Sequence, residues 1–280
     1  MRGKVVVITG GTSGIGQVAA EQLAGMGARI ILVARNEERA AASLARLRQA
    51  GPEVDHSARY ADLSSIAATR KLAAEIATAE PRIDVLINNA GALFNDRRLS
   101  PDGLEMTFAV NHMAYFVLTE GLRQRLTASG PARIVNTASA AHLGAKIDFD
   151  DLQMAEGYSG FGAYGRSKLA NILFTRELAR RLADSPVTAN CLHPGFVATR
   201  FGDNAGGLSQ VIFPVAKLFA ISPQKGAETI VYLASSPEVA TATGLYFVQR
   251  KPKTPSAAAR DDAAAARLWA ESEKIAASVV

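Results

Sequence analysis

Residues 4–16 read KVVVITGGTSGIG, a β-branched run followed at once by closely spaced glycines and the start of a helical pattern. A strand, a glycine-rich turn and a helix in this order are typical of the first half of a dinucleotide-binding βαβ unit. Gly10, Gly14 and Gly16 let the backbone turn sharply, approach a phosphate and pack the helix against the sheet. The stretch alone also fits an ordinary tight turn, so its meaning depends on the segments around it.

The rest of the chain continues the alternation of strand and helix patterns. The expected strands are RIILVA, a more polar run over 57–60, DVLIN, RIVNTAS, TANCLHPG and GLYFVQ, and the expected helices cover 15–26, 37–50, 65–79, 104–125 and 224–234. Most strand runs are apolar without polar alternation, which indicates burial on both faces. We therefore predict an α/β fold: a single-domain, Rossmann-type, doubly wound parallel sheet over 1–280 with helices on both faces.

Composition narrows the class of protein. The chain has 280 residues, of which 48% are hydrophobic and 20% charged, as expected for one globular domain. Its 31 Lys and Arg residues are scattered among 26 acidic ones without a long basic run, so we expect no nucleic-acid partner. No apolar stretch reaches the roughly 20 residues that span a bilayer. No apolar leader precedes Val5, and Cys191 is the single cysteine, so we expect a cytoplasmic protein.

Basic side chains follow the second expected strand. An acidic residue there would bind the adenosine ribose of NAD, but this chain has Arg35 and Asn36. A guanidinium can bond a 2′-phosphate and stack on adenine, and Arg39 lies one turn further on. The expected cofactor is therefore NADP(H). The alternative is that Arg35 points to solvent and Glu37 binds the ribose.

Two further segments contain candidate cofactor contacts. Asp62 and Leu63 follow the third strand, where a carboxylate can accept from the adenine amino group while the leucine packs on the ring. Asp62 fits a helix cap nearly as well. In NNAG (88–91), the small residues Ala90 and Gly91 let the backbone lie against a ribose, and Asn88 either joins them or links strands through its amide.

Tyr164 and Lys168 stand four positions apart, which places them on one face of a helix. A nearby ammonium favours the phenolate and so favours proton transfer, although the spacing also fits an exposed polar face. Ser139 ends a strand at the carboxyl edge of the sheet, where a hydroxyl can donate to a substrate carbonyl or simply form a turn. Asn111 lies inside a helical pattern, where asparagine is unfavourable, so we expect a buried polar role.

The histidines do not suggest a metal site. His112, His142 and His193 match no compact ligand spacing, and we interpret them as structural.

Taken together, TGGTSGIG, NNAG, Asn111, Ser139, the Tyr164 and Lys168 pair and HPGFVAT resemble the short-chain dehydrogenase/reductase family, in the family's order and over most of the chain. VNHMAYFVLT, SAAHLG, the segment from 164 to 182 and LWAESEK resemble its retinol dehydrogenase-like branch. The long interval from Ser139 to Tyr164 is similar to that branch as well.

The resemblance implies an NADP(H)-dependent carbonyl reductase or alcohol dehydrogenase that acts on an apolar ketone, aldehyde or alcohol. Ser139 would orient the carbonyl, Tyr164 would donate the proton, and Lys168 would lower the pKa of Tyr164 and bind the nicotinamide ribose. Asn111 would hold a water for proton resupply. The implied cofactor contacts are Gly10, Thr12, Ser13, Gly14, Ile15, Gly16, Arg35, Asn36, Arg39, Asp62, Leu63, Asn88, Ala90, Gly91, Tyr164, Lys168, Pro194, Gly195, Val197 and Thr199.

The remaining segments carry expectations of their own. The apolar stretch 196–223 resembles the family's substrate lid, although it also fits a surface helix or a membrane contact. The tail over 252–280 is expected to end in an amphipathic helix that caps the sheet edge. The resemblance implies homo-oligomers built on helices over 104–125 and 161–182, unless the tail obstructs them.

Two other functions fit the same motifs. One is a non-catalytic NADPH-binding sensor or scaffold, which would commonly lack the tyrosine or the lysine. The other is an enzyme like protochlorophyllide reductase, which reduces a carbon–carbon double bond and is typically richer in cysteine near the pocket.

Overall fold

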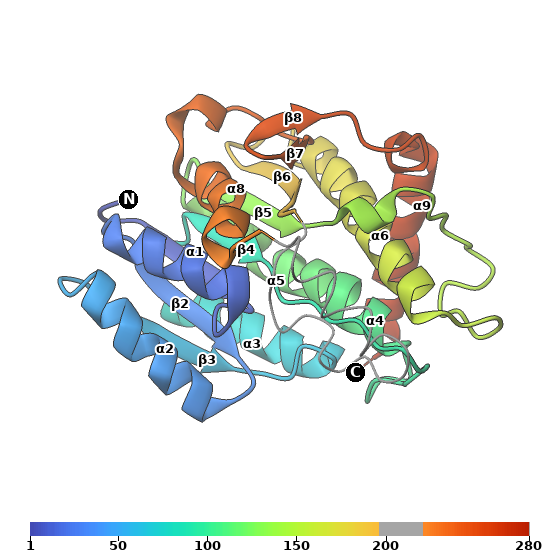
Figure 1. Ribbon diagram of the computed structural model, residues 1–280, viewed down its shortest axis with the longest axis horizontal. Coiled ribbons are helices and arrows are strands. Elements are labelled where there is room, and N and C mark those ends of the chain that lie inside the picture. Colours follow the sequence, from blue (N-terminus) through green and yellow to red (C-terminus); the bar gives the residue numbers. More distant parts are fainter. Residues whose placement is uncertain (196–220, 280) are drawn as a thin grey trace.

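The computed structural model describes residues 1–195 and 221–279 and contains an eight-stranded sheet within them (Figure 1). The strand order is β3-β2-β1-β4-β5-β6-β7-β8, parallel throughout except for the antiparallel β7–β8 pair. The order reverses between β1 and β4, which is the switch point of a doubly wound sheet. The predicted Rossmann-type α/β fold is confirmed.

The strands are β1 (Val5–Thr9), β2 (Arg29–Ala34), β3 (Ser57–Tyr60), β4 (Val85–Asn88), β5 (Arg133–Thr137), β6 (Thr188–His193), β7 (Tyr246–Val248) and β8 (Lys251–Lys253). The longer helices are α1 (Gly14–Gly25), α2 (Glu37–Ala50), α3 (Ile66–Ala79), α5 (Ala114–Ala128), α6 (Gly160–Arg181), α8 (Pro223–Ser235) and α9 (Asp262–Ser278). The short ones are α4 (Met106–Phe108), the π-helix η1 (Ala109–Met113), and the 3₁₀-helices η2 (Ala140–His142), η3 (Pro237–Val239) and η4 (Ala258–Arg260). No helix in the described ranges is long and apolar enough to cross a membrane.

Successive side chains of the central strands enter different cores. Val6 and Ile8 pack in a cluster with α1 and α8, whereas Val7 packs on the opposite face with α3, α5 and α6. Figure 1 shows these two helical layers on either side of the sheet. Both faces of the sheet are buried by helices, which explains why the strand sequences lack polar alternation.

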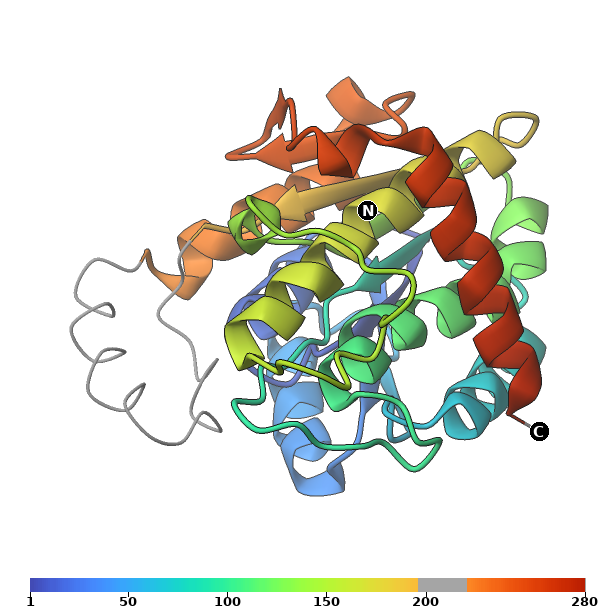
Figure 2. The ribbon, with the colours of Figure 1, turned by 90° about the vertical axis from the view of Figure 1, so that its right-hand side faces the viewer.

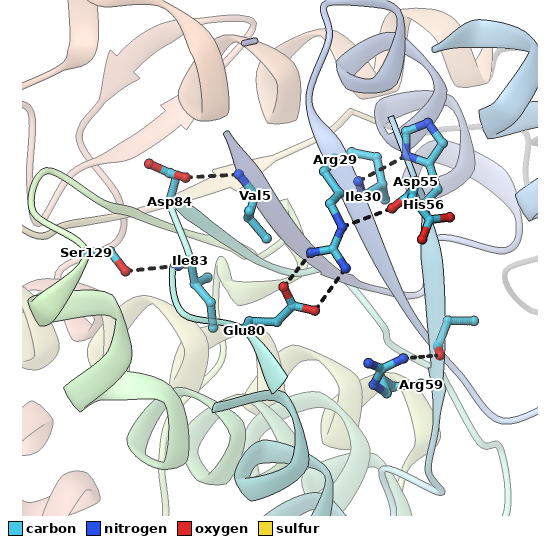
Figure 3. Close-up of polar contacts among 11 residues, drawn as sticks. Val5, Arg29, Ile30, Asp55, His56, Arg59, Glu80, Ile83, Asp84 and Ser129 are labelled. Carbon is cyan, nitrogen blue, oxygen red and sulfur yellow. Dashed lines mark hydrogen bonds and ion pairs between the residues drawn. The ribbon is translucent and has the colours of Figure 1, made fainter. Parts of the chain in front are cut away.

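Hydrogen bonds and ion pairs connect residues at the amino ends of the strands (Figure 3). The Asp84 carboxylate accepts from the Val5 amide at 2.9 Å and pairs with Arg82 at 2.7 Å. Arg29, at the start of β2, forms a bidentate ion pair with Glu80. Burial alone would raise the pKa of Asp84, but the bonds from Arg82 and from the Val5 amide hold it below its usual range. This edge is occupied by internal contacts, which leaves the carboxyl edge for ligands.

The single helix expected over 104–125 is interrupted. The Glu105 carboxylate accepts from the amides of Thr107 and Phe108, so the helix begins only at α4. It then widens into η1, which contains Asn111, before α5 begins. Single π-turns of this kind occur frequently at functional sites.

The C-terminal helix does not cap the sheet edge. That edge is taken by β8, which pairs with β7, while α9 packs on the outer side of α6 (Figure 2). Trp269 of α9 is 2% exposed; its ring stacks on Phe174 of α6 at 5.7 Å and meets Phe116 of α5 edge-on at 5.0 Å. The expected position of this helix is therefore wrong, although Pro252 and Lys253 at the start of the tail do lie at the edge. Part of the outer surface of α5 and α6 is covered by the chain itself.

Replacing Trp269 with alanine removes the largest fully buried side chain of the tail. We expect Trp269→Ala to lower the free energy of unfolding by about 3–5 kcal/mol, because it leaves a cavity between α9 and α6. Chemical denaturation measures the change. The matched control is Lys274→Ala, on the exposed side of the same helix, which should shift stability by no more than about 0.5 kcal/mol. Equal losses in both variants would show that Trp269 does not anchor the tail.

Candidate active site

The carboxyl ends of the central strands bring the predicted motifs to one edge of the sheet. β1 pairs with β4, β4 with β5 and β5 with β6, all in parallel. The glycine loop, NNAG, Ser139 and Pro194 therefore emerge side by side, although they are widely separated in sequence.

The glycine loop is packed too closely to carry side chains. Gly10 has φ +67° and Gly14 φ +55°. A Cβ on Gly10 would lie 2.9 Å from the Cα of Ala90, and one on Gly16 would lie 2.3 Å from the Gly10 carbonyl oxygen. α1 begins at Gly14, and the side chain of its N-cap, Ser13, makes no capping bond. The loop and the first amides of α1 thus fit a bound pyrophosphate, with Thr12 and Ile15 half-buried beside them.

Asn88 and Asn89 differ in role. Asn88 is fully buried, and its amide donates to Thr119 at 3.0 Å and to Asn136 at 2.9 Å, so the geometry favours the strand-linking alternative. Asn89 instead donates to the carbonyl oxygens of Thr9 and Gly10 at 3.2 and 3.3 Å. Asn89 was not among the predicted residues. The sequence placed it inside NNAG, but that pattern does not indicate which of the two asparagines faces the glycine loop.

The residues expected around the adenosine lie at the surface. Arg35, Asn36 and Arg39 are exposed, and the Asn36 side chain caps α2 by accepting from the Arg39 amide at 2.8 Å. Neither arginine forms an ion pair with another described residue. The guanidinium groups are therefore not committed to a carboxylate within that part of the chain.

Asp62 and Leu63 follow β3. Asp62 is exposed and accepts from the amide and the hydroxyl of Ser64 at 3.0 and 2.8 Å. Ser65 caps α3 by accepting from the Ala68 amide, so the alternative of Asp62 as the helix cap is wrong. Leu63 is half-buried and packs against the core.

Lys168 is the most buried charged group of the site. Its side chain lies on α6 with 2% of the residue exposed, and Nζ donates to the Thr137 carbonyl at 3.0 Å. Nζ also lies 5.5 Å from the ring centre of Tyr164 and 5.8 Å from that of Tyr115. Burial lowers the pKa of Lys168 to about 7. The amine can therefore gain or lose a proton near neutral pH.

Tyr164 and Ser139 are brought together. Burial raises the pKa of Tyr164 to about 12, and a hydrogen bond from Ser139 opposes that rise. Burial dominates, so the net shift of the Tyr164 pKa is upward and not the lowering expected from Lys168. The Ser139 hydroxyl also accepts from the Ala141 amide at 3.2 Å, which holds its side chain at the start of η2.

Asn111 joins the π-turn to the loop after β4. Its side-chain oxygen accepts from the Ala92 amide at 2.8 Å, and its nitrogen donates to the Ala92 carbonyl and to the Ser167 hydroxyl at 2.9 Å each. A Cβ on Gly91 would lie 3.3 Å from the Asn111 oxygen and 3.4 Å from Lys168 Nζ. Asn111, Gly91 and Lys168 are therefore neighbours, as the predicted site requires.

Tyr115 also belongs to this group, and sequence reasoning missed it. Its hydroxyl donates to the Ala90 carbonyl at 2.8 Å while its ring lies beneath Lys168. Its position four residues after Asn111 was the available signal.

The loop after β6 is described only in part. Pro194 and Gly195 are half-buried, and Gly195 has φ +91°, where a Cβ would lie 2.6 Å from the Ile221 side chain. Val197, Thr199 and most of the expected lid lie outside the described residues. Within those described, no group of three His, Cys, Asp or Glu side chains could hold a metal.

Comparison with known proteins agrees with this arrangement. The family described as short chain dehydrogenase matches residues 4–206. Human retinol dehydrogenase 13 is 42% identical over 281 residues, which cover 98% of this chain and 84% of that protein.

Two solved structures extend the comparison. An uncharacterized protein from Mycobacterium Paratuberculosis superposes with a TM-score of 0.79 at 33% identity, covering 98% of this chain and 94% of that chain. A short chain dehydrogenase from Burkholderia cenocepacia in complex with NADP gives a TM-score of 0.70 at 27% identity, covering 88% of this chain and 96% of that chain. The chain therefore belongs to the short-chain dehydrogenase family, as an oxidoreductase similar to retinol dehydrogenases.

Proposed function

We propose that this protein is an NADP(H)-dependent carbonyl reductase or alcohol dehydrogenase that acts on an apolar ketone, aldehyde or primary or secondary alcohol. The observation that carries the proposal is the convergence of Ser139, Tyr164 and the buried Lys168 at the carboxyl edge of the sheet. A polar donor, a phenol and an amine in this arrangement match what carbonyl reduction needs from a protein.

The residues present fit a nicotinamide cofactor, which the family uses as NAD(H) or NADP(H). The glycine loop and the start of α1 would bind the pyrophosphate, Tyr164 and Lys168 the nicotinamide ribose, and Pro194 and Gly195 the nicotinamide side. When bound, this group supplies or accepts the hydride.

The protein's own contribution is the control of one proton. The Ser139 hydroxyl would donate to the substrate oxygen and hold it beside the Tyr164 phenol. With a pKa of about 12, that phenol is protonated at neutral pH and can donate to a far more basic alkoxide. Lys168, with a pKa of about 7, can then restore the proton, and the Asn111 and Ala92 contacts hold the loop beside it.

Apolar side chains flank the catalytic residues. Leu143, four positions after Ser139, is 63% exposed, and Phe161, one turn before Tyr164 on α6, is 67% exposed. Exposed apolar side chains next to polar catalytic groups are typical of a binding surface for an apolar molecule. The similarity to proteins named retinol dehydrogenases supports the same substrate class.

NADP(H) is favoured over NAD(H) by the end of β2. Arg35 follows the strand next to β1, which carries the glycine loop, and its guanidinium is exposed. The related Burkholderia enzyme was solved with NADP, which supports the same choice here.

Tyr164→Phe removes the proton donor and keeps the ring. We expect kcat for carbonyl reduction to fall by about 10²–10⁴, while the NADPH dissociation constant changes little. Steady-state kinetics on a panel of ketones, aldehydes and retinal and fluorescence titration of NADPH measure the two effects. Tyr232→Phe on α8 is the matched control and should keep activity. A fully active Tyr164→Phe variant would contradict the proposed mechanism. A wild-type protein that binds NADPH tightly but reduces no substrate would favour the sensor function.

The two reaction directions should differ in pH dependence. Alcohol oxidation needs the phenolate of Tyr164, whose pKa is raised to about 12, so kcat/KM for oxidation should climb as pH rises from 7 to 9. Carbonyl reduction needs the phenol, which stays protonated over this range. In a single turnover, where proton resupply by Lys168 plays no part, the reductive rate constant should stay nearly constant from pH 7 to 9. Profiles in both directions on one substrate pair test this. A reductive rate that drops across this interval would mean that the donor titrates near neutral pH.

Arg35→Ala tests the cofactor assignment. Losing a charge-assisted bond to a 2′-phosphate should reduce kcat/KM with NADPH by about tenfold or more and leave the value with NADH nearly unchanged. Arg48→Ala, in the last turn of α2, the helix that follows Arg35, is the matched control and should affect neither cofactor. Equal losses with both cofactors would show that Arg35 does not bind the phosphate.

A further inference from the structure

The polypeptide after β8 is hydrogen-bonded to the catalytic edge through a buried histidine. His142 is 1% exposed and is the last residue of η2, the turn that starts at Ser139. Its ring Nδ1 lies 2.7 Å from the Ser139 carbonyl oxygen, and the Ser256 amide donates to its Nε2 at 3.3 Å. One imidazole therefore connects the tail to the backbone of the catalytic serine.

The two bonds determine the protonation state of the ring. A carbonyl oxygen can only accept, so Nδ1 carries the hydrogen, and a backbone amide can only donate, so Nε2 presents its lone pair. His142 is thus the neutral Nδ1–H tautomer. The edge of its ring meets Tyr246 of β7 at a centroid distance of 5.2 Å, which fixes its plane.

A second buried histidine links the tail to the other catalytic segment. His112, next to Asn111, is 1% exposed, and its Nε2 lies 2.9 Å from the hydroxyl of Ser272 on α9. That hydroxyl donates in turn to the Leu268 carbonyl within the helix. The segment that contains Asn111 and the segment that contains Ser139 therefore each have a histidine that is bonded to the tail.

We infer that the C-terminal tail is a positioning element of the active site and that His142 is the residue through which it holds Ser139. The inference rests on the proposed function, since it assigns Ser139 the role of orienting the substrate. The carbonyl that His142 bonds belongs to Ser139 itself, so only the Cα separates it from the serine side chain. The hydroxyl of that side chain must meet the substrate oxygen and Tyr164 together. Small displacements of such a donor reduce the rate of the chemical step more than they reduce binding.

A proline at position 256 removes the amide hydrogen that His142 accepts. The matched control Ser256→Ala keeps that hydrogen, and both variants lose the Ser256 hydroxyl that accepts from the Ala259 amide. Single-turnover reduction with NADPH already bound separates positioning from folding: misplaced Ser139 lowers the rate constant, whereas partial unfolding lowers only the amplitude. We expect Ser256→Pro to lower the rate constant by about tenfold or more, with Ser256→Ala within about twofold of the wild type and NADPH affinity preserved in both.

His142→Phe is a second test, because it keeps an aromatic ring against Tyr246 and loses the hydrogen bonds to Ser139 and Ser256. It should show the same fall in the single-turnover rate constant. If both variants lose amplitude alone, the tail stabilises the protein without positioning Ser139, and the inference is overturned. Lack of wild-type activity on every substrate would instead defeat the proposed function.

A measurement independent of activity covers the case in which the variants do not fold. Nitrogen NMR of the histidine-labelled wild type at neutral pH should show the His142 ring in the neutral Nδ1–H tautomer. Its signals are assigned by their absence in His142→Phe or by contacts to Tyr246. A proton on Nε2 would exclude the bond from Ser256 and overturn the inference.

Discussion

The geometry of the candidate active site depends on one buried amine. Placing the Lys168 ammonium away from water is costly, and the fold compensates with the Thr137 carbonyl at 3.0 Å and the faces of two tyrosine rings. The same carbonyl also accepts from Asn171, one turn further along α6. These contacts fix α6 against the end of β5, and thereby fix Tyr164 relative to Ser139, which follows β5 by two residues. The part of the burial cost that these contacts do not offset lowers the pKa of Lys168 to about 7.

The two edges of the sheet are built on opposite principles. At the amino edge, the carboxylates are paired with donors: Asp84 accepts from the Val5 amide and from Arg82, and Glu80 pairs with Arg29. At the carboxyl edge, glycines and small residues let backbone segments approach one another closely. The polar side chain of Asn111 is fixed there by its hydrogen bonds to Ala92. A parallel sheet places all of its carboxyl ends on one side, so this asymmetry concentrates the reactive groups.

Most of the fold could be predicted from the sequence, because strands that are buried on both faces of the sheet consist of apolar runs without polar alternation. The site was predictable as a set of residues but not as a set of environments. A π-turn has nearly the same apolar spacing as an α-helix, so the widening at Asn111 leaves no clear pattern. The opposite roles of Asn88 and Asn89 depend on which face of a strand end each occupies. The raised pKa of Tyr164 depends on packing by segments far away in sequence, which outweighs the local spacing to Lys168.

The tail shows the same limit, because an amphipathic pattern predicts a helix without naming its partner. Its apolar side chains pack on α5 and α6 through Trp269, and Arg181 of α6 lies 4.4 Å over the indole ring. Within the described residues, α9 thus covers part of the outer surface of the two helices on which the resemblance implies contacts between subunits. Because the same segment bonds His112 and His142, covering that surface also fixes the backbone beside Asn111 and Ser139. The packing that stabilises α9 and the geometry of the catalytic edge are therefore energetically coupled within one chain.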